Sequence, residues 1–265
     1  MTADVAPTAQ ISQARVRVEG LHKVYGTGDE RKVILGSVDF TIGQGEYVSV
    51  VGPSGSGKTT VLRCIAGLLE PTGGTVYFDG QPVRSTPDKL AVVFQDYSRS
   101  LLPWLSIEAN VTLPLRGKGM PKARQHELAT EALEAVGLGG SSRHYPWQLS
   151  GGMQQRVAIA RALAYQPKAL LMDEPFASVD AQTRSELEDL VLKLRKEFGI
   201  TVISVTHDID EAVYMSDRVI VLSGQPASVA QIVSVDLGSD RDQIRTKSDP
   251  LFAQLRAQVL LAVRH

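Results

Sequence analysis

The feature that most constrains the fold is an apolar run that passes directly into a glycine-rich loop and then a helix. Residues 46–52 read EYVSVVG, as expected of a strand buried on both faces of a parallel sheet. The loop GPSGSGKTT follows at residues 52–60 and has the spacing Gly-x-x-x-x-Gly-Lys-Thr. Its backbone N–H groups can point inward at phosphate oxygens. A Gly/Ser turn without a ligand is the alternative, but strand, loop and helix stand in the order that a phosphate site requires.

Each residue type in this loop has an expected role. Lys58 reaches the β and γ phosphates of a nucleotide, and the Thr59 hydroxyl can ligate Mg²⁺. The other nucleotide-binding candidates in the loop are Gly52, Pro53, Ser54, Gly55, Ser56, Gly57 and Thr60.

A second motif, ALLMDEP at residues 169–175, ends an apolar strand in two acids. A carboxylate at Asp173 would lie at the carboxyl edge of the sheet, where it can hold Mg²⁺ through water. Glu174 is the candidate for the group that orients and polarises an attacking water. Two solvated acids at a strand end are the alternative. Together the two motifs favour a hydrolytic site over a simple nucleotide pocket.

Two polar residues follow other predicted strands. Gln95 comes after LAVVF and His207 after ITVISVT, so both are expected at the same sheet edge. The Gln95 amide can reach the metal or the water, and a neutral His207 imidazole can contact the γ-phosphate. Either residue alone is weak evidence, since a strand-end Gln is usually solvated and a lone His is usually structural.

A second glycine pair opens an apolar-periodic helix in LSGGMQQRVAIARAL, residues 149–163. Glycines at a helix N-terminus offer N–H groups to phosphate oxygens, so the chain has two phosphate-facing loops. Tyr25, just after the first predicted strand, could stack on adenine or simply pack against the protein.

Composition excludes several classes of protein. Of 265 residues, 43% are hydrophobic and 22% charged, which is typical of a globular protein. The formal charge of −1 gives no basic field, so we expect no nucleic-acid partner. No apolar run approaches a bilayer span, and the N-terminus does not resemble a signal peptide. The single cysteine, Cys64, is expected to be a small core residue.

The order of elements predicts an α/β protein. Residues 1–14 form a flexible tail, and strands at 15–21 and 37–42 with a hairpin at Asp79-Gly80 predict an antiparallel β subdomain. Strands alternating with helices from residue 169 predict a sheet with parallel strands flanked by helices. A helical segment, about residues 97–165, is inserted within the domain at 15–240, and residues 241–265 form a helical extension.

In order, these motifs resemble those of the ATPase subunits of ABC transporters over nearly the whole chain. GPSGSGKT resembles Walker A, Gln95 the Q-loop, LSGGM the signature and ALLMDE Walker B. Ser178 to Asp180 resemble the D-loop, and His207 the switch histidine. Tyr25 matches the adenine-stacking aromatic. The resemblance implies a P-loop NTPase fold of the ABC type, with ATP and Mg²⁺ as ligands and with Thr59, Gln95 and Asp173 at the metal.

The resemblance also implies why there are two phosphate loops. In this family two subunits face head to tail, and the signature of one closes over the ATP held by the other. Ser150, Gly151 and Gly152 are then expected to contact the partner's nucleotide, together with Asp180. Met153 departs from the usual Gln or Glu, which implies a tuned rate, and Val179 replaces the more usual Leu.

Residues 94–115, FQDYSRSLLPWLSIEANVTLPL, resemble the importers of nitrate, aliphatic sulfonates and taurine. Leu101, Leu102 and Trp104 could form an exposed patch for a permease helix, or could pack within the helical segment. The resemblance implies transmembrane permease subunits, a second copy or a similar ATPase subunit, and indirectly a solute-binding protein. The expected location is cytoplasmic, peripheral on the inner face of the membrane.

Two other functions remain as alternatives. A soluble ABC protein working without a permease would usually carry two cassettes, zinc-binding insertions or long basic extensions, and none is present in this sequence. A phosphotransferase for a small molecule would share the first loop but would have no use for the signature or the D-loop.

Overall fold

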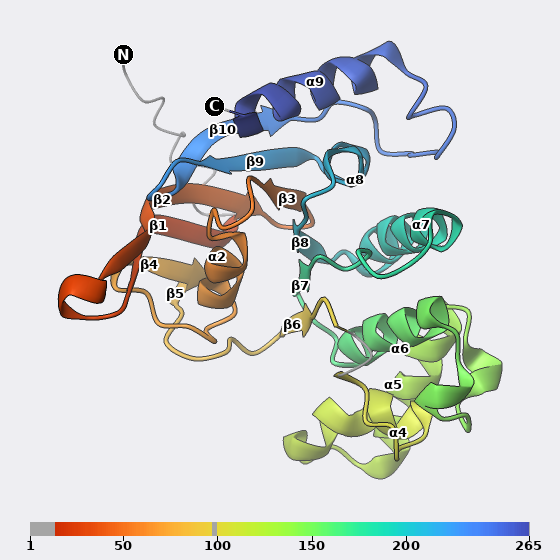
Figure 1. Ribbon diagram of the computed structural model, residues 1–265. Helices are drawn as coiled ribbons and strands as arrows, with labels where there is room; N and C mark the ends of the chain where they lie inside the picture. The colour runs from red at the N-terminus through yellow and green to blue at the C-terminus, as the bar shows by residue number, and fades with distance from the viewer. Residues whose placement is uncertain (1–13, 97–99, 265) are drawn as a thin grey trace. The chain divides into compact units, whose positions relative to one another are not determined.

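The computed structural model describes residues 14–96 and 100–264, and the chain divides into two compact units (Figure 1). Unit 1 comprises the chain up to Pro87 and from Thr201 onward, and unit 2 is Asp88–Ile200. Residues 1–13 of the predicted tail and residues 97–99 of the predicted helical segment lie outside the described residues.

Unit 1 contains the predicted antiparallel sheet, in the strand order β2-β1-β4-β5. The strands are β1 (Ala14–Tyr25), β2 (Lys32–Gly43), β4 (Gly73–Phe78) and β5 (Gln81–Pro82), with the short 3₁₀ helix η1 (Gly28–Glu30) between the first two. The predicted hairpin turns at Asp79 and Gly80, which have φ of 47° and 75°. Asp-Gly suits this turn because it tolerates two left-handed residues in succession.

A second, mixed sheet in unit 1 places four strands in the order β10-β9-β3-β8. They are β3 (Tyr47–Val51), β8 (Thr201–Val205), β9 (Arg218–Ser223) and β10 (Ser228–Ser234). β3 is parallel to both neighbours, whereas β10 is antiparallel to β9. Every residue of β3 and β8 is buried, which is consistent with their mostly apolar sequences.

The α-helices among the described residues of unit 1 are α2 (Lys58–Ile65), α8 (Ile209–Met215) and α9 (Pro250–Arg264). Cys64 in α2 is buried, as predicted, and burial raises the pKa of its thiol to about 11. The C-terminal α9 packs on α8, β9 and β10, with Phe252, Leu255 and Val259 on its buried face (Figure 1).

Unit 2 contains a parallel strand pair, β6 (Leu90–Val93) and β7 (Ala169–Asp173). Its helices are α4 (Ile107–Thr112), α5 (Lys122–Ala135), α6 (Gly151–Ala164) and α7 (Ala181–Phe198), with 3₁₀ turns η2 (Leu113–Lys118), η3 (Gly139–Ser141) and η4 (Pro146–Gln148). α4, α5 and α6 pack on one another, and α6 also contacts β6 and α7. Within the described ranges, no helix combines the length and apolar character that a bilayer span requires.

The structure corrects part of the predicted surface patch. Leu101 is only 1% exposed and belongs to the core, Leu102 is half-buried, and Trp104 is 70% exposed. Of the two alternatives, Leu101 therefore packs internally, whereas Trp104 is exposed. The polar groups of the neighbouring Asn110 explain why: its side chain bonds the Leu102 N–H and carbonyl at 2.7 and 3.1 Å, which folds this segment back onto α4.

Candidate functional site

The glycine-rich loop of unit 1 is built around a buried lysine. Lys58 begins α2, and its Nζ donates to the carbonyl oxygens of Gly52 and Pro53 at 2.9 and 3.0 Å. Gly57 precedes it in the left-handed region, at φ 79°, where a side chain would also collide with Leu35. This backbone turn curls the loop around the ammonium group.

The loop also contains a buried hydroxyl that lacks a partner. Ser56 is 4% exposed, and its Oγ has no hydrogen bond among the described residues. A buried polar group without a partner costs free energy, and a ligand, an ion or a water molecule can supply the missing bond. Phosphate oxygens are suitable acceptors for this hydroxyl. The loop therefore fits a phosphate group.

Strand register places His207 at the same edge as this loop. Val50 of β3 pairs with Val205 of β8, and two residues beyond them stand Gly52 and His207. Thr206 Oγ1 accepts the Asp208 N–H at 3.1 Å, and this short turn leads from the exposed His207 into α8. His207 therefore lies at the strand edge that carries the glycine-rich loop of unit 1.

Tyr25 ends β1 opposite Lys32 of β2. Its side chain is 41% exposed, and the Lys23 ammonium lies 5.3 Å from the ring centroid. An exposed ring that is held at the end of a strand can accept a flat aromatic ligand on its open face.

The same register argument joins two candidates in unit 2. Val93 of β6 pairs with Met172 of β7, and two residues beyond them stand Gln95 and Glu174. The Gln95 Nε2 donates to Glu174 Oε2 at 3.0 Å, which aims the amide and the carboxylate at each other. Glu174 has φ of 45°, a left-handed conformation that is uncommon for a side-chain-bearing residue. Backbone strain of this kind concentrates at functional sites.

A buried amide braces the segment that follows Glu174. Gln155 of α6 is 0% exposed, and its Nε2 donates to the Pro175 carbonyl at 2.8 Å. Sequence reasoning missed this residue, because a Gln in an apolar-periodic helix carries no local signal of a distant carbonyl partner.

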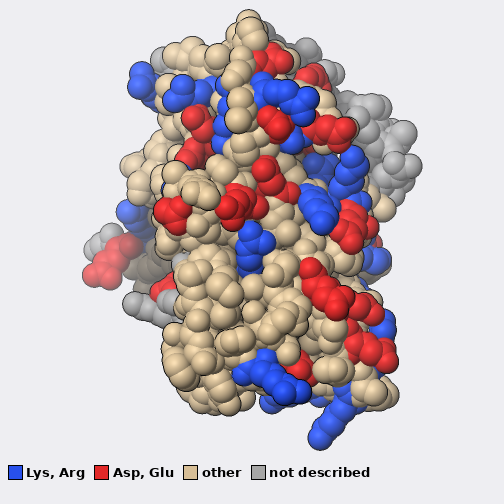
Figure 2. Space-filling view, turned by 90° about the vertical axis from the view of Figure 1, so that its right-hand side faces the viewer, with Lys and Arg blue, Asp and Glu red and all other residues tan. Residues whose placement is uncertain are grey.

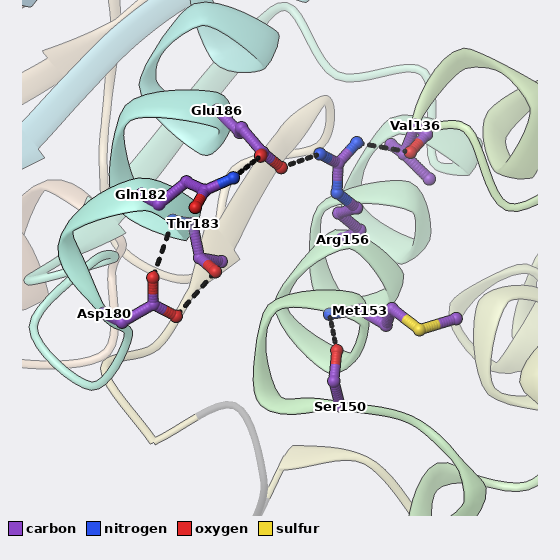
Figure 3. A network of polar contacts seen from close by, with 8 residues as sticks. All are labelled: Val136, Ser150, Met153, Arg156, Asp180, Gln182, Thr183 and Glu186. Carbon is purple, nitrogen blue, oxygen red and sulfur yellow. Dashed lines mark hydrogen bonds and ion pairs between the residues drawn. The ribbon is translucent and has the colours of Figure 1, made fainter.

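The signature segment begins α6 with a capped N-terminus. Ser150 is the N-cap residue, and its Oγ accepts the Met153 N–H at 3.3 Å (Figure 3). Met153 supplies only its backbone to this cap, and its side chain points away from Asp180 and Thr183 (Figure 3). Any residue other than proline can make this bond, so the departure at Met153 leaves the cap intact.

Asp180 likewise caps α7. Its carboxylate accepts the Thr183 N–H at 3.0 Å and the Thr183 hydroxyl at 2.7 Å (Figure 3). The bonds from the Thr183 backbone and then its side chain hold the pKa of Asp180 below its ordinary value, so the carboxylate remains charged. Thr183 was not identified from the sequence, although Asp180 itself is a favoured N-cap residue.

The described residues include no group of three or more His, Cys, Asp or Glu side chains that could hold a metal ion. Mg²⁺ in nucleotide sites usually takes one or two carboxylates and completes its shell with water and phosphate oxygens. The smaller predicted set of a hydroxyl, an amide and one carboxylate is compatible with that chemistry.

Comparison with known proteins gives one consistent family. The family model described as ABC transporter matches residues 35–177. An uncharacterised ABC transporter ATP-binding protein of Methanocaldococcus jannaschii is 46% identical over 94% of this chain and 91% of its own length. The nitrate import ATP-binding protein NrtD of Synechococcus elongatus is 38% identical over 98% and 96%. The bicarbonate transport ATP-binding protein CmpD of a Synechocystis strain is 38% identical over 96% and 90%.

Solved structures agree with the sequence relatives. A dimeric ATP-binding cassette in a post-hydrolysis state, bound to ADP and Pi, superposes with a TM-score of 0.72 at 38% identity. The match covers 83% of this chain and 98% of that one. The predicted fold class is confirmed. The chain belongs to the ABC transporter family, as an ATP-binding protein whose ATP hydrolysis is coupled to transport.

Proposed function

We propose that this chain is the ATPase subunit of an importer for a small solute with an oxyanion group, such as nitrate, bicarbonate or an aliphatic sulfonate, including taurine. Two relatives that match nearly the full chain carry the names of nitrate and bicarbonate transport proteins. Residues 94–115 resemble the importers of nitrate, sulfonates and taurine.

Unit 1 supplies the groups that bind ATP. Lys58 and the backbone N–H groups of the loop from Gly52 to Thr60 hold the phosphates, and the Ser56 hydroxyl donates to a phosphate oxygen there. Tyr25 stacks on the adenine. The exposed His207 contacts the γ-phosphate from the neighbouring strand end.

Unit 2 supplies the hydrolytic groups. Glu174 orients and polarises the attacking water, and Gln95 holds that carboxylate in place. Gln95 and Asp173 are the ligands that unit 2 would offer to Mg²⁺, and the Thr59 hydroxyl is the ligand that unit 1 would offer; the ion would neutralise charge on the phosphates. The single observation that carries the proposed ATP hydrolysis is the hydrogen bond from Gln95 to Glu174, since it joins two residues that follow neighbouring strands in register.

The signature and D-loop serve the partner's nucleotide. Ser150, Gly151 and Gly152 contact the ATP bound by a second subunit, and Asp180 acts beside them. Both segments begin helices, where N–H groups face outward and favour anions. ATP then closes a dimer with two composite sites, and hydrolysis reopens it.

The partners are transmembrane permease subunits at the inner face of the membrane and a second copy of this chain or a similar subunit. A solute-binding protein acts through the permease. Acidic and basic side chains are mixed over the face that Figure 2 shows, and the formal charge is −1, which does not favour a nucleic-acid partner.

Replacing Glu174 with Gln tests the mechanism. The amide keeps the shape but cannot polarise water, so Glu174→Gln should bind ATP with wild-type affinity and hydrolyse it very slowly. In the presence of ATP, this variant should therefore accumulate as a dimer, which gel filtration would detect. A variant that binds nucleotide yet stays monomeric would contradict the composite-site mechanism.

The growth of a deletion strain tests the identity of the transported solute. A strain that lacks this gene should grow poorly on one of nitrate, taurine or an alkanesulfonate as nitrogen or sulfur source, or at limiting bicarbonate. The permease should co-purify with the tagged chain. Normal growth on every one of these sources would refute the solute class, and a chain that purifies without any membrane protein would favour an ABC ATPase working without a permease.

A further inference from the structure

We infer that Thr183 is a positioning residue that fixes the signature glycine Gly152 through its methyl group and the D-loop Asp180 through its hydroxyl. The inference rests on the proposed function, in which both motifs act on the partner's ATP. It gives one side chain, outside both motifs, control over their relative position.

The contact with Gly152 is close. A methyl group built on Gly152 would overlap the Cγ2 methyl of Thr183, whereas the Thr183 Cβ and Oγ1 would lie at 3.7 and 3.8 Å from it. The glycine is therefore required here by packing against α7, in addition to any approach of phosphate oxygens. Only the Thr183 methyl stands in the way of a side chain.

The hydroxyl of the same residue points the other way. It donates to Asp180 Oδ2 at 2.7 Å, while the Thr183 N–H donates to Oδ1 at 3.0 Å (Figure 3). Both carboxylate oxygens are thus held by one residue. The methyl and hydroxyl of Thr183 cannot move independently, so α6 and the D-loop are coupled through it.

A second contact between α6 and α7 lies one turn further along both helices. Arg156 of α6 donates to Glu186 of α7 at 3.4 Å and to the Val136 carbonyl at 3.0 Å (Figure 3). Gln182 also reaches Glu186, at 3.4 Å. Because Glu186 is exposed, this pair contributes little energy beside the close contact of Thr183 with Gly152.

Four variants in the Glu174→Gln chain separate the two halves of the contact. Thr183→Val keeps the γ methyl and replaces the hydroxyl with a second methyl, whereas Thr183→Ser keeps the hydroxyl and loses the methyl. Gly152→Ala introduces the overlap, and Gly152→Ala with Thr183→Ser removes it again. Thr130→Val, in the middle of α5, makes the same chemical change outside the network and is the control.

The readout is the ATP-dependent dimer dissociation constant, measured by sedimentation. Thr183→Val should weaken the dimer about two- to tenfold, as expected for one lost hydrogen bond, with an unfolding temperature matching that of Thr130→Val. Gly152→Ala should weaken it about tenfold or more, because overpacking displaces α6. Adding Thr183→Ser should recover most of that loss.

Two results would overturn the inference. One is a Thr183→Val dimer as tight as that of the Thr130→Val control. The other is a Gly152→Ala variant whose loss of dimer affinity is the same whether residue 183 is Thr or Ser. If the Glu174→Gln parent itself does not dimerise, the proposed function fails. The Gly152 contact is then decided by unfolding temperature, which Gly152→Ala should lower and Thr183→Ser should restore.

Discussion

At the scale of single residues, two side chains of the proposed composite site also begin helices. Ser150 caps α6 and Asp180 caps α7, so each stabilises its own chain whether or not a partner is present. Removing either side chain would therefore alter folding and function together. Residues that touch these segments without capping a helix separate the two effects better.

Gln155 is such a residue. We predict that Gln155→Leu lowers both kcat and the free energy of unfolding, and that the fall in kcat is larger than the loss of stability explains. The variant leaves the Pro175 carbonyl unpaired, which costs about 1–3 kcal/mol, and it loosens the segment next to Glu174. Steady-state ATPase kinetics and thermal unfolding check both effects.

Gln125→Leu is the matched control, because Gln125 also donates to a backbone carbonyl, that of Met120, at 2.8 Å. It should lose stability without a change in kcat. Equal kcat values for Gln155→Leu and Gln125→Leu would show that the Pro175 contact has no role in hydrolysis.

At the scale of elements, local pattern predicted most of what was found. Strand, loop and helix around Lys58 follow from adjacent residues, and the hairpin at Asp79-Gly80 follows from turn chemistry. β10 was missed because SVAQIVS is an edge strand in which only Val233 is buried, so it lacks the apolar run of a central strand. The buried Leu101 and the Gly152–Thr183 contact could not be predicted, because both depend on which elements pack together.

The helical pattern predicted at the C-terminus corresponds to α9. Its buried and exposed faces contribute differently to the free energy of unfolding. Leu255 is 7% exposed and Leu261 is 57% exposed in the same helix. Leu255→Ala should lower the free energy of unfolding by about 2–5 kcal/mol, the cost of a core cavity. Leu261→Ala should change it by less than about 0.5 kcal/mol. Denaturant unfolding of both variants measures the difference. Equal losses of unfolding free energy would mean that α9 does not pack on the rest of unit 1 through its apolar face.

At the scale of the whole molecule, the account requires two chains for one reaction. One copy of the Lys58 loop and one copy of the signature then serve different nucleotides. A chain that lacks only one of the two functions should still complement a chain that lacks only the other, since a mixed dimer contains one intact site. This property separates a composite site from a site contained within one chain.

The most direct measurement is the ATPase rate of a 1:1 mixture of Lys58→Ala and Gly151→Asp chains. Each variant alone should be inactive, because each homodimer has two defective sites. The mixture should recover up to about a quarter of the wild-type rate, since half of the dimers are mixed and each of these has one intact site of two. A mixture that forms mixed dimers yet stays as inactive as its components would contradict the account.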